Sequence, residues 1–164
     1  LHKRQPMKTV NFPLLIVCIT VPLLAGGVSG FITADAITGW YLNLQKPSFN
    51  PPNYVFGPVW TLLYTLMGIS LYLVLNSANK KDRNDALVIF SMQLFLNFFW
   101  SIFFFYFERP DLALVIIVGM LLSISYMIFL FKKTKPIAGY LQIPYLLWVS
   151  FATLLNASIW WLNR

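Results

Sequence analysis

The sequence predicts an all-α membrane protein, a bundle of five transmembrane helices, and two observations carry that prediction. First, 59% of the 164 residues are hydrophobic and only 10% are charged. A soluble domain carries about 25% charged residues, so this chain has too little polar material to cover a surface that faces water. Second, the chain contains five apolar segments, each long enough to cross a hydrocarbon layer of roughly 30 Å, which takes about 20 residues. A lipid bilayer is therefore the expected surrounding of most of the chain.

Each apolar segment is expected to be a helix. Lipid cannot hydrogen-bond the backbone, so only helices and closed barrels cross a membrane. The segments lack the two-residue alternation of barrel strands, which excludes a barrel. The predicted spans are residues 11–34, 58–78, 86–107, 112–131 and 137–162.

One domain is predicted to cover residues 7–164. We interpret residues 1–6 as a remnant of cloning that precedes a natural start at Met7. The single histidine, His2, falls in this stretch, so the working protein is expected to contain none. The first span holds Pro13 and Pro22 and lacks a clear Ala-x-Ala site, which is atypical of a cleaved signal peptide.

The later connections are short, which predicts antiparallel neighbours in a compact bundle. Residues 108–111 are expected to form a tight turn in which Asp111 caps the fourth span, and residues 132–136 are expected to form another.

The first connection, residues 39–56, is the exception, because it is much longer than a turn requires. Its five aromatic residues argue against disorder. Pro47, Pro51 and Pro52 each restrict φ and remove a backbone donor, so we predict a semi-rigid cover over a pocket.

Lysine and arginine are unequally divided between the two ends of the predicted bundle. Cytoplasmic loops are enriched in these residues, so we predict a multi-pass protein of the cell membrane, with a cytoplasmic N-terminus and with the C-terminus and first loop outside. The formal net charge of +7 is confined to such connections and does not indicate nucleic acid as a partner. The end with the N-terminus carries Lys3, Arg4, Lys8, Lys80, Lys81, Arg83, Lys132, Lys133 and Lys135, and the other end carries Lys46, Arg109 and Arg164.

The spans lack the residues that acid–base or metal chemistry needs. No acid or base lies within them, so a proton relay is not expected. Cys18 is the single cysteine and His2 the single histidine, so we predict no metal site and no bound cofactor.

Aromatic and amide side chains recur at helical spacing on three of the spans and predict a pocket for a flat, largely apolar ligand. Packing is the competing interpretation, because tryptophans gather at membrane interfaces and asparagines join helices. The residues are Trp60, Tyr64 and Gly68 on the second span, Gln93, Asn97, Trp100 and Phe104 on the third, and Trp148, Ala152, Leu155 and Asn156 on the fifth.

Gly26 and Gly30 are spaced as in motifs that allow close helix approach. The spacing fits a dimer face and packing within one chain equally well.

Three blocks of residues resemble the translocator protein family, also called the tryptophan-rich sensory proteins or peripheral-type benzodiazepine receptors. The chain is similar to bacterial members of that family. The first block contains Leu44-Gln45-Lys46-Pro47, Pro51-Pro52 and Phe56-Gly57-Pro58-Val59-Trp60. The second contains Gln93-Leu94, Leu96-Asn97 and Trp100-Ser101, and the third contains Pro144-Tyr145-Leu146, Trp148-Val149 and Leu155-Asn156.

The resemblance implies a five-helix bundle, often a homodimer, that acts as a receptor or sensor for porphyrins and other tetrapyrroles. It also implies binding of synthetic isoquinoline carboxamides and benzodiazepines in a pocket roofed by the first loop. The end of the fifth span lacks the tyrosine of the cholesterol motif of animal relatives, which makes cholesterol a doubtful ligand. Matching ligand-binding positions are Tyr41, Pro51, Trp60, Asn97, Trp100, Trp148, Ala152 and Leu155.

Two further activities follow from the resemblance. One is light-dependent porphyrin degradation, with Trp60 or Trp148 as the catalytic electron donor. The alternative is transport of tetrapyrroles or other small molecules, although the lack of intramembrane charges and of an internal repeat counts against active coupling.

Overall fold

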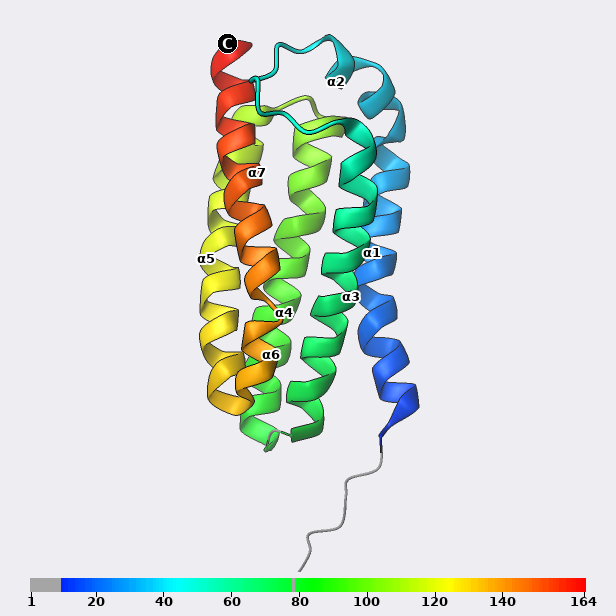
Figure 1. Ribbon diagram of the computed structural model, residues 1–164, viewed down its shortest axis with the longest axis vertical. Coiled ribbons are helices and arrows are strands. Elements are labelled where there is room, and N and C mark those ends of the chain that lie inside the picture. Colours follow the sequence, from blue (N-terminus) through cyan, green and yellow to red (C-terminus); the bar gives the residue numbers. More distant parts are fainter. Residues whose placement is uncertain (1–9, 78) are drawn as a thin grey trace, which may run out of the picture.

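Five long helical segments stand side by side in one bundle (Figure 1). The structure is a computed structural model that describes residues 10–77 and 79–164. The stretch interpreted as a cloning remnant and Met7 lie outside the described residues. The all-α prediction is confirmed: all five segments are long and apolar enough to cross a membrane. The helices are α1 (Phe12–Thr38), α3 (Asn53–Ser77), α4 (Lys80–Ser101) with the π-helix η1 (Ile102–Tyr106), α5 (Pro110–Thr134), and α6 (Pro136–Tyr140) with α7 (Ile143–Leu162).

The helices are longer than the apolar cores that the sequence marks. α3 begins at Asn53, five residues before the predicted start, so Pro58 lies inside the helix. α1 continues to Thr38 and includes Asp35, which is exposed. The fifth span is divided after Tyr140, where two residues separate α6 from α7.

Residues 39–52, which we call the lid, cross one end of the bundle beside the C-terminus (Figure 1). The lid contains the short helix α2 (Trp40–Asn43), followed by an irregular segment that holds the three prolines. Tyr41 donates a hydrogen bond from its hydroxyl to Asn50 Oδ1 at 3.0 Å, which joins the two parts of the lid.

The expected cap on the fourth span is wrong. The residue before α5 is Arg109, and it makes no side-chain capping hydrogen bond. Asp111 is instead the second residue of the helix, and its carboxylate accepts two hydrogen bonds from the Arg109 guanidinium, at 2.9 and 2.7 Å. A residue already inside the first turn cannot take the capping position, but its negative charge still favours the helix N-terminus.

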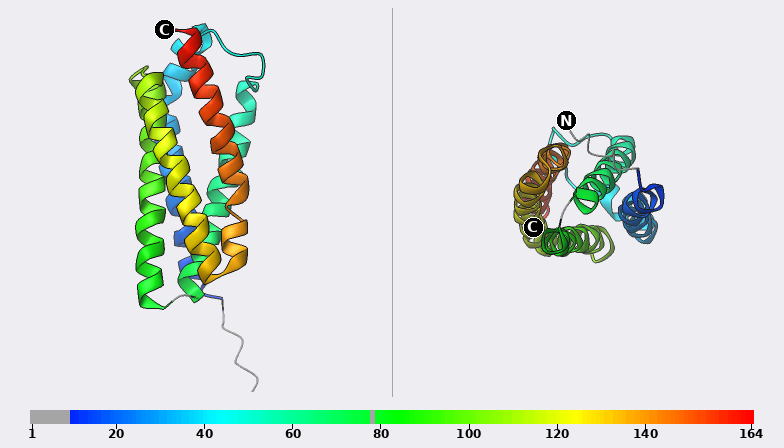
Figure 2. Two further views of the ribbon diagram at one scale, coloured as in Figure 1. Left: turned by 90° about the vertical axis from the view of Figure 1, so that its left-hand side faces the viewer. Right: turned by 90° about the horizontal axis from the view of Figure 1, so that it is seen from below.

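α1 lies at the edge of the bundle, next to α3, as the end-on view in Figure 2 shows. α4 packs chiefly on α5, and α5 packs on α7. Away from the lid, the side chains of Met67, Val74, Met120 and Met127 have no exposed surface. The candidate site lies in the half of the bundle near the lid.

Candidate ligand-binding cavity

A cavity of about 420 Å³ lies between α1, α3 and the α4–η1 segment, below the lid. Its size falls in the range of small-molecule sites, about 300–1,000 Å³. The residues that line it are Leu23, Gly26, Gly27, Ser29, Gly30, Thr33, Ile37, Tyr41, Asn53, Phe56, Gly57, Trp60, Thr61, Tyr64, Asn97, Trp100, Ser101 and Phe105.

Two tryptophans form the aromatic wall of the cavity. Trp60 stacks on Tyr64, one helical turn further along α3, with ring centroids 5.4 Å apart and an interplanar angle of 28°. The ring centroid of Trp100 on α4 lies 6.3 Å from that of Trp60. The indole Nε1 of Trp100 donates to Asn156 Oδ1 at 3.0 Å, so a buried amide on α7 holds the orientation of this ring.

A buried polar network joins three helices at the inner end of the cavity. The Tyr64 hydroxyl donates to Asn97 Oδ1 at 2.7 Å, and Asn97 Nδ2 donates to the Tyr145 hydroxyl at 3.1 Å. The Tyr145 hydroxyl in turn donates to Gln93 Oε1 at 2.8 Å. Asn97 therefore both lines the cavity and joins α3 to α7.

Tyr41 forms the part of the cavity wall that belongs to the lid. Only 4% of Tyr41 is exposed, and its ring lies 5.4 Å from that of Phe105 on η1. Burial raises the pKa of the Tyr41 phenol, and the hydrogen bond with Asn50 opposes that shift to a smaller extent. The phenol is therefore neutral at pH 7. The ammonium group of Lys46 lies 4.7 Å from the centroid of the Tyr41 ring. Lys46 itself does not line the cavity.

α1 supplies a wall of small residues that we did not predict as part of the site. Gly26, Gly27 and Gly30 contribute only backbone. The hydroxyls of Ser29 and Thr33 are bound within the helix, to the carbonyls of residues 26 and 29 respectively. The Gly-Gly-x-x-Gly pattern in an apolar span was the available signal, because small residues create space as well as close packing.

Half of the predicted ligand-binding positions line the cavity: Tyr41, Trp60, Asn97 and Trp100. The others, Pro51, Trp148, Ala152 and Leu155, are not part of its lining. Sequence reasoning also missed Asn53, Phe56 and Gly57, because the predicted span began later than α3 does, and it missed Thr61, which lies inside the predicted span.

Phe56 separates Trp148 from the cavity, which explains why Trp148 is not part of the lining. Phe56 lines the cavity, and its ring meets that of Trp148 edge to face at 5.8 Å, so Trp148 lies behind it. Among the described residues, the buried indole Nε1 of Trp148 has no hydrogen-bond partner. A buried donor without a partner costs free energy, about 1–3 kcal/mol, and a ligand acceptor could satisfy it.

The lining of the cavity is uncharged and partly aromatic. None of the described residues that line it carries a charge. Flat faces from α3 and α4 can stack on a ligand ring, whereas α1 offers a smooth surface of small residues. The described residues of the lining include no carboxylate, lysine, histidine or cysteine.

The fold defines a multi-pass helical membrane protein, and its cavity is lined in part by aromatic rings. Residues 18–162 match the TspO/MBR family, and the chain belongs to that family. It is 38% identical over 155 residues to the tryptophan-rich protein TspO of Archaeoglobus fulgidus, covering 94% of this chain and 99% of the relative. It is 40% identical over 150 residues to the protein of that name from Chlorobaculum tepidum, covering 91% and 95%. The human translocator protein is 36% identical over 134 residues, covering 80% and 79%.

Proposed function

We propose that the protein is a membrane receptor or sensor that binds porphyrins and other tetrapyrroles in the cavity below the lid. The observation that carries this proposal is the pair of indoles, Trp60 and Trp100, on one wall of an uncharged cavity. A flat macrocycle buries a large apolar area against such rings. Family membership is consistent with a sensory role, since one relative, in Cereibacter sphaeroides, is named a tryptophan-rich sensory protein.

The neutral lining favours a ligand without a required metal. No described residue of the lining is a histidine or a cysteine, so a metal-free porphyrin is the expected ligand. Neutral, flat synthetic ligands such as isoquinoline carboxamides and benzodiazepines fit the same requirements. A macrocycle that is to reach Trp148 on α7 must first displace the ring of Phe56.

Quenching of tryptophan fluorescence by protoporphyrin tests the proposal. We expect Trp60→Phe to lower the affinity about tenfold, because it removes the larger stacking surface of an indole, equivalent to about 1.4 kcal/mol. Trp161→Phe is the matched control, since Trp161 is exposed near the C-terminus and away from the cavity. Equal affinities for the wild-type protein and both variants would place the ligand elsewhere.

Light-dependent porphyrin degradation is a second candidate, favoured by the contacts of Trp60. Its ring touches those of Tyr64, Trp100 and Tyr145, a group of oxidisable side chains next to the ligand. In this mechanism Trp60 gives an electron to the illuminated porphyrin, which passes it to dioxygen to form superoxide. The oxidised Trp60 then takes an electron back from the porphyrin, and the resulting porphyrin radical cation combines with superoxide, so that dioxygen is added to the macrocycle. Trp148 becomes a second donor only once Phe56 has moved.

Illumination of the protein with bound porphyrin in air tests this activity. The porphyrin absorption band should disappear faster than with heat-denatured protein, and Trp60→Phe should remove most of the difference. Equal bleaching in the wild-type protein and in Trp60→Phe at matched occupancy would contradict the role of Trp60 and leave the binding proposal intact.

We also propose the membrane orientation that the charges predict. The described cations at the end opposite the lid are Lys80, Lys81, Arg83, Lys132, Lys133 and Lys135, which supports a cytoplasmic position for that end. Homodimer formation, which the family resemblance implies, stays a prediction.

A further inference from the structure

The lid is tied down over the end of the cavity that faces water. Asn163, just past the end of α7, exchanges two hydrogen bonds with the backbone of Gln45: Gln45 N–H donates to Asn163 Oδ1 at 2.9 Å, and Asn163 Nδ2 donates to the Gln45 carbonyl at 2.9 Å. A third bond, from Tyr41 to Asn50, closes the lid on itself. A ligand that enters through the lid must break these contacts.

The side of the cavity between α1 and α3 is open by contrast. Gly27 and Gly30 on α1 and Gly57 on α3 line the cavity, and all three are exposed. A Cβ atom placed on any of them would meet no atom within 4 Å. Thr61, one turn along α3 from Gly57, is exposed as well. We call these four residues the window.

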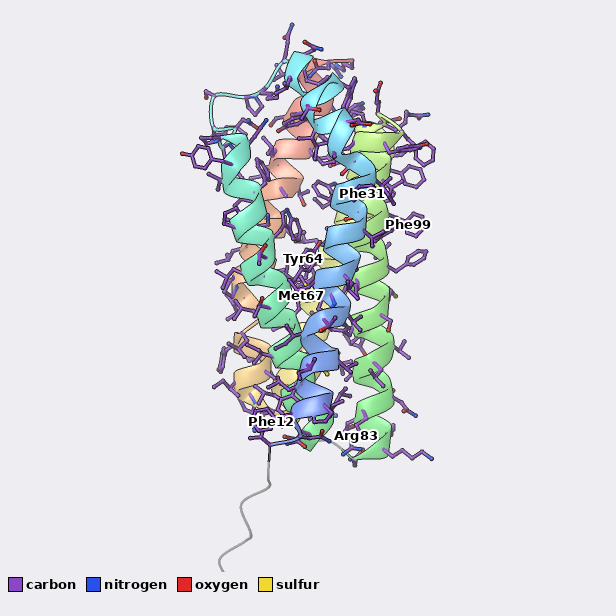
Figure 3. All side chains as sticks on the ribbon, turned by 90° about the vertical axis from the view of Figure 1, so that its right-hand side faces the viewer. Phe12, Phe31, Tyr64, Met67, Arg83 and Phe99 are labelled. Atoms are coloured by element: carbon purple, nitrogen blue, oxygen red, sulfur yellow. The ribbon has the colours of Figure 1, made fainter. Side chains whose placement is uncertain are left out.

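The window begins where the contact between α1 and α3 ends. A Cβ on Gly26 would overlap the ring of Tyr64, and a Cβ on Gly68 would lie 2.6 Å from the Cys18 carbonyl oxygen. The two helices are therefore pressed together up to the level of Tyr64. Figure 3 shows them diverging from that level towards the lid.

The window lies at the depth of the lipid chains. Gly27 and Gly30 are two and five residues from the midpoint of α1, about 3 and 8 Å along its axis. The hydrocarbon layer extends about 15 Å from the centre of the bilayer. Large apolar side chains beside the window are strongly exposed, Phe31 at 85% and Leu62 at 58%, as expected of residues that face lipid.

We propose that the cavity opens to the lipid layer through this window, and that hydrophobic ligands enter and leave sideways between α1 and α3 rather than through the lid. The identity of the ligand rests on the proposed function, but the opening itself does not. The route selects ligands that dissolve in the membrane before they bind, and it needs no movement of the lid.

Brominated lipids test the opening without any ligand. Bromine atoms halfway along the acyl chain quench indoles that the chains can reach, and the contribution of Trp60 is the difference between wild-type protein and Trp60→Phe. We expect brominated vesicles to lower that contribution at least twofold, and we expect Gly30→Leu, which fills the window, to restore it. Val28→Leu is the control, because Val28 is exposed on α1 but lies outside the cavity lining. Quenching of Trp60 by aqueous iodide, without quenching by brominated lipid, would overturn the proposal.

Uptake rates test the route. Protoporphyrin in the vesicle membrane is mixed with the protein, and quenching is followed in time. Narrowing the window in Gly30→Leu should slow both association and dissociation, each about tenfold, because a barrier on the path acts in both directions, whereas a loss of contacts with the ligand would quicken dissociation. A variant that simply damaged the site would raise Kd.

A cross-linked lid tests the alternative route, in which the ligand enters through the lid. Gln45→Cys with Asn163→Cys, in a Cys18→Ala background, is joined by an oxidant or a short bis-maleimide, with thiol titration to confirm closure. We expect uptake to be unchanged when the lid is locked. Uptake that stops in the locked protein and proceeds normally in Gly30→Leu would refute the lateral route while leaving porphyrin binding established. Absence of quenching in the wild-type protein would refute the proposed function, and the brominated-lipid result would still decide on the opening.

Discussion

The two halves of the α1–α3 helix pair use glycine in opposite ways. Away from the lid, Gly68 lets the backbones meet, and a Cβ there would overlap Ile19. Towards the lid, Gly27, Gly30 and Gly57 face open space and form the edge of a cavity. A glycine in a spanning helix leaves space where a side chain would be. The position of the neighbouring helix determines whether that space is filled by a close backbone contact or remains part of a cavity.

Substitution of glycine in the two halves should give the largest contrast. Gly68→Leu must push α1 away, because the obstructing atoms are backbone, and we expect it to destabilise the protein by about 3 kcal/mol. Gly57→Ala, on the same helix, meets nothing and should be neutral or stabilising by up to about 1 kcal/mol. Unfolding in mixed detergent measures the free energy of unfolding of both variants. Equal losses of stability in Gly68→Leu and Gly57→Ala would show that the two halves of the helix pair do not differ in packing.

The polar network at the boundary between the halves should give the next largest effect. Tyr145→Phe removes the hydroxyl that accepts from Asn97 and donates to Gln93, leaving two buried amides short of partners. We expect a loss of about 2 kcal/mol in the free energy of unfolding. Tyr126→Phe is the control, since Tyr126 is exposed on α5. A loss as small as the control's would mean that other groups satisfy the amides.

Removing Phe56 should sharpen the comparison between the two tryptophans. In the wild-type protein Trp60 lines the cavity and Trp148 lies behind Phe56, so Trp148→Phe should weaken porphyrin binding less than Trp60→Phe does. In a Phe56→Ala background, Trp148 is uncovered, and we expect the effect of Trp148→Phe to grow by about 1 kcal/mol. Titration of all four variants closes this double-mutant cycle. Additive effects would show that Phe56 does not screen Trp148.

The smallest expected effect concerns the lid. Asn163→Ala removes both hydrogen bonds to Gln45 at a partly exposed site, which should cost about 1 kcal/mol locally. Amide hydrogen exchange at Gln45 should quicken about fivefold, the equivalent of that free energy. Asn43→Ala, which loses only a bond to the Gly39 carbonyl, leaves this link in place. An unchanged exchange rate at Gln45 would show that the lid is held by other contacts.

The fold could be predicted from the sequence because lipid imposes a simple rule. Uncharged runs of sufficient length must be helices, so the five spans follow from composition alone. The start of α3 was placed late, because Pro58 suggested a first helical residue and the polar residues before it suggested a loop. The division of the last span after Tyr140 had a signal that the sequence prediction did not use, Pro144, which is the second residue of α7.

The site could be predicted only in part, for a physical reason. Trp60 and Trp148 both lie on predicted faces with helical spacing, and that spacing cannot show whether Phe56 stands in front of one of them. The wall on α1 was harder still, since the same glycines suit a dimer, a close contact or a cavity. Such distinctions depend on how neighbouring helices are placed, which is set by packing over the whole bundle.

The π-helix η1 contains one more residue per hydrogen-bonded turn than an α-helix would, and this affects how the segment responds to a deletion. Its hydrogen bonds reach one residue further than those of an α-helix, as between Phe107 N–H and the Ile102 carbonyl at 3.0 Å. This wider turn places two consecutive rings, Phe104 and Phe105, against Tyr41. A deletion of one codon within residues 102–106 could therefore be absorbed by a return to α-helical geometry, with the loss of one of these rings. A similar deletion in the middle of α5 would turn every following side chain by about 100°. Residues 102–106 are thus a part of the membrane domain where a one-residue deletion would be tolerated better than in α5.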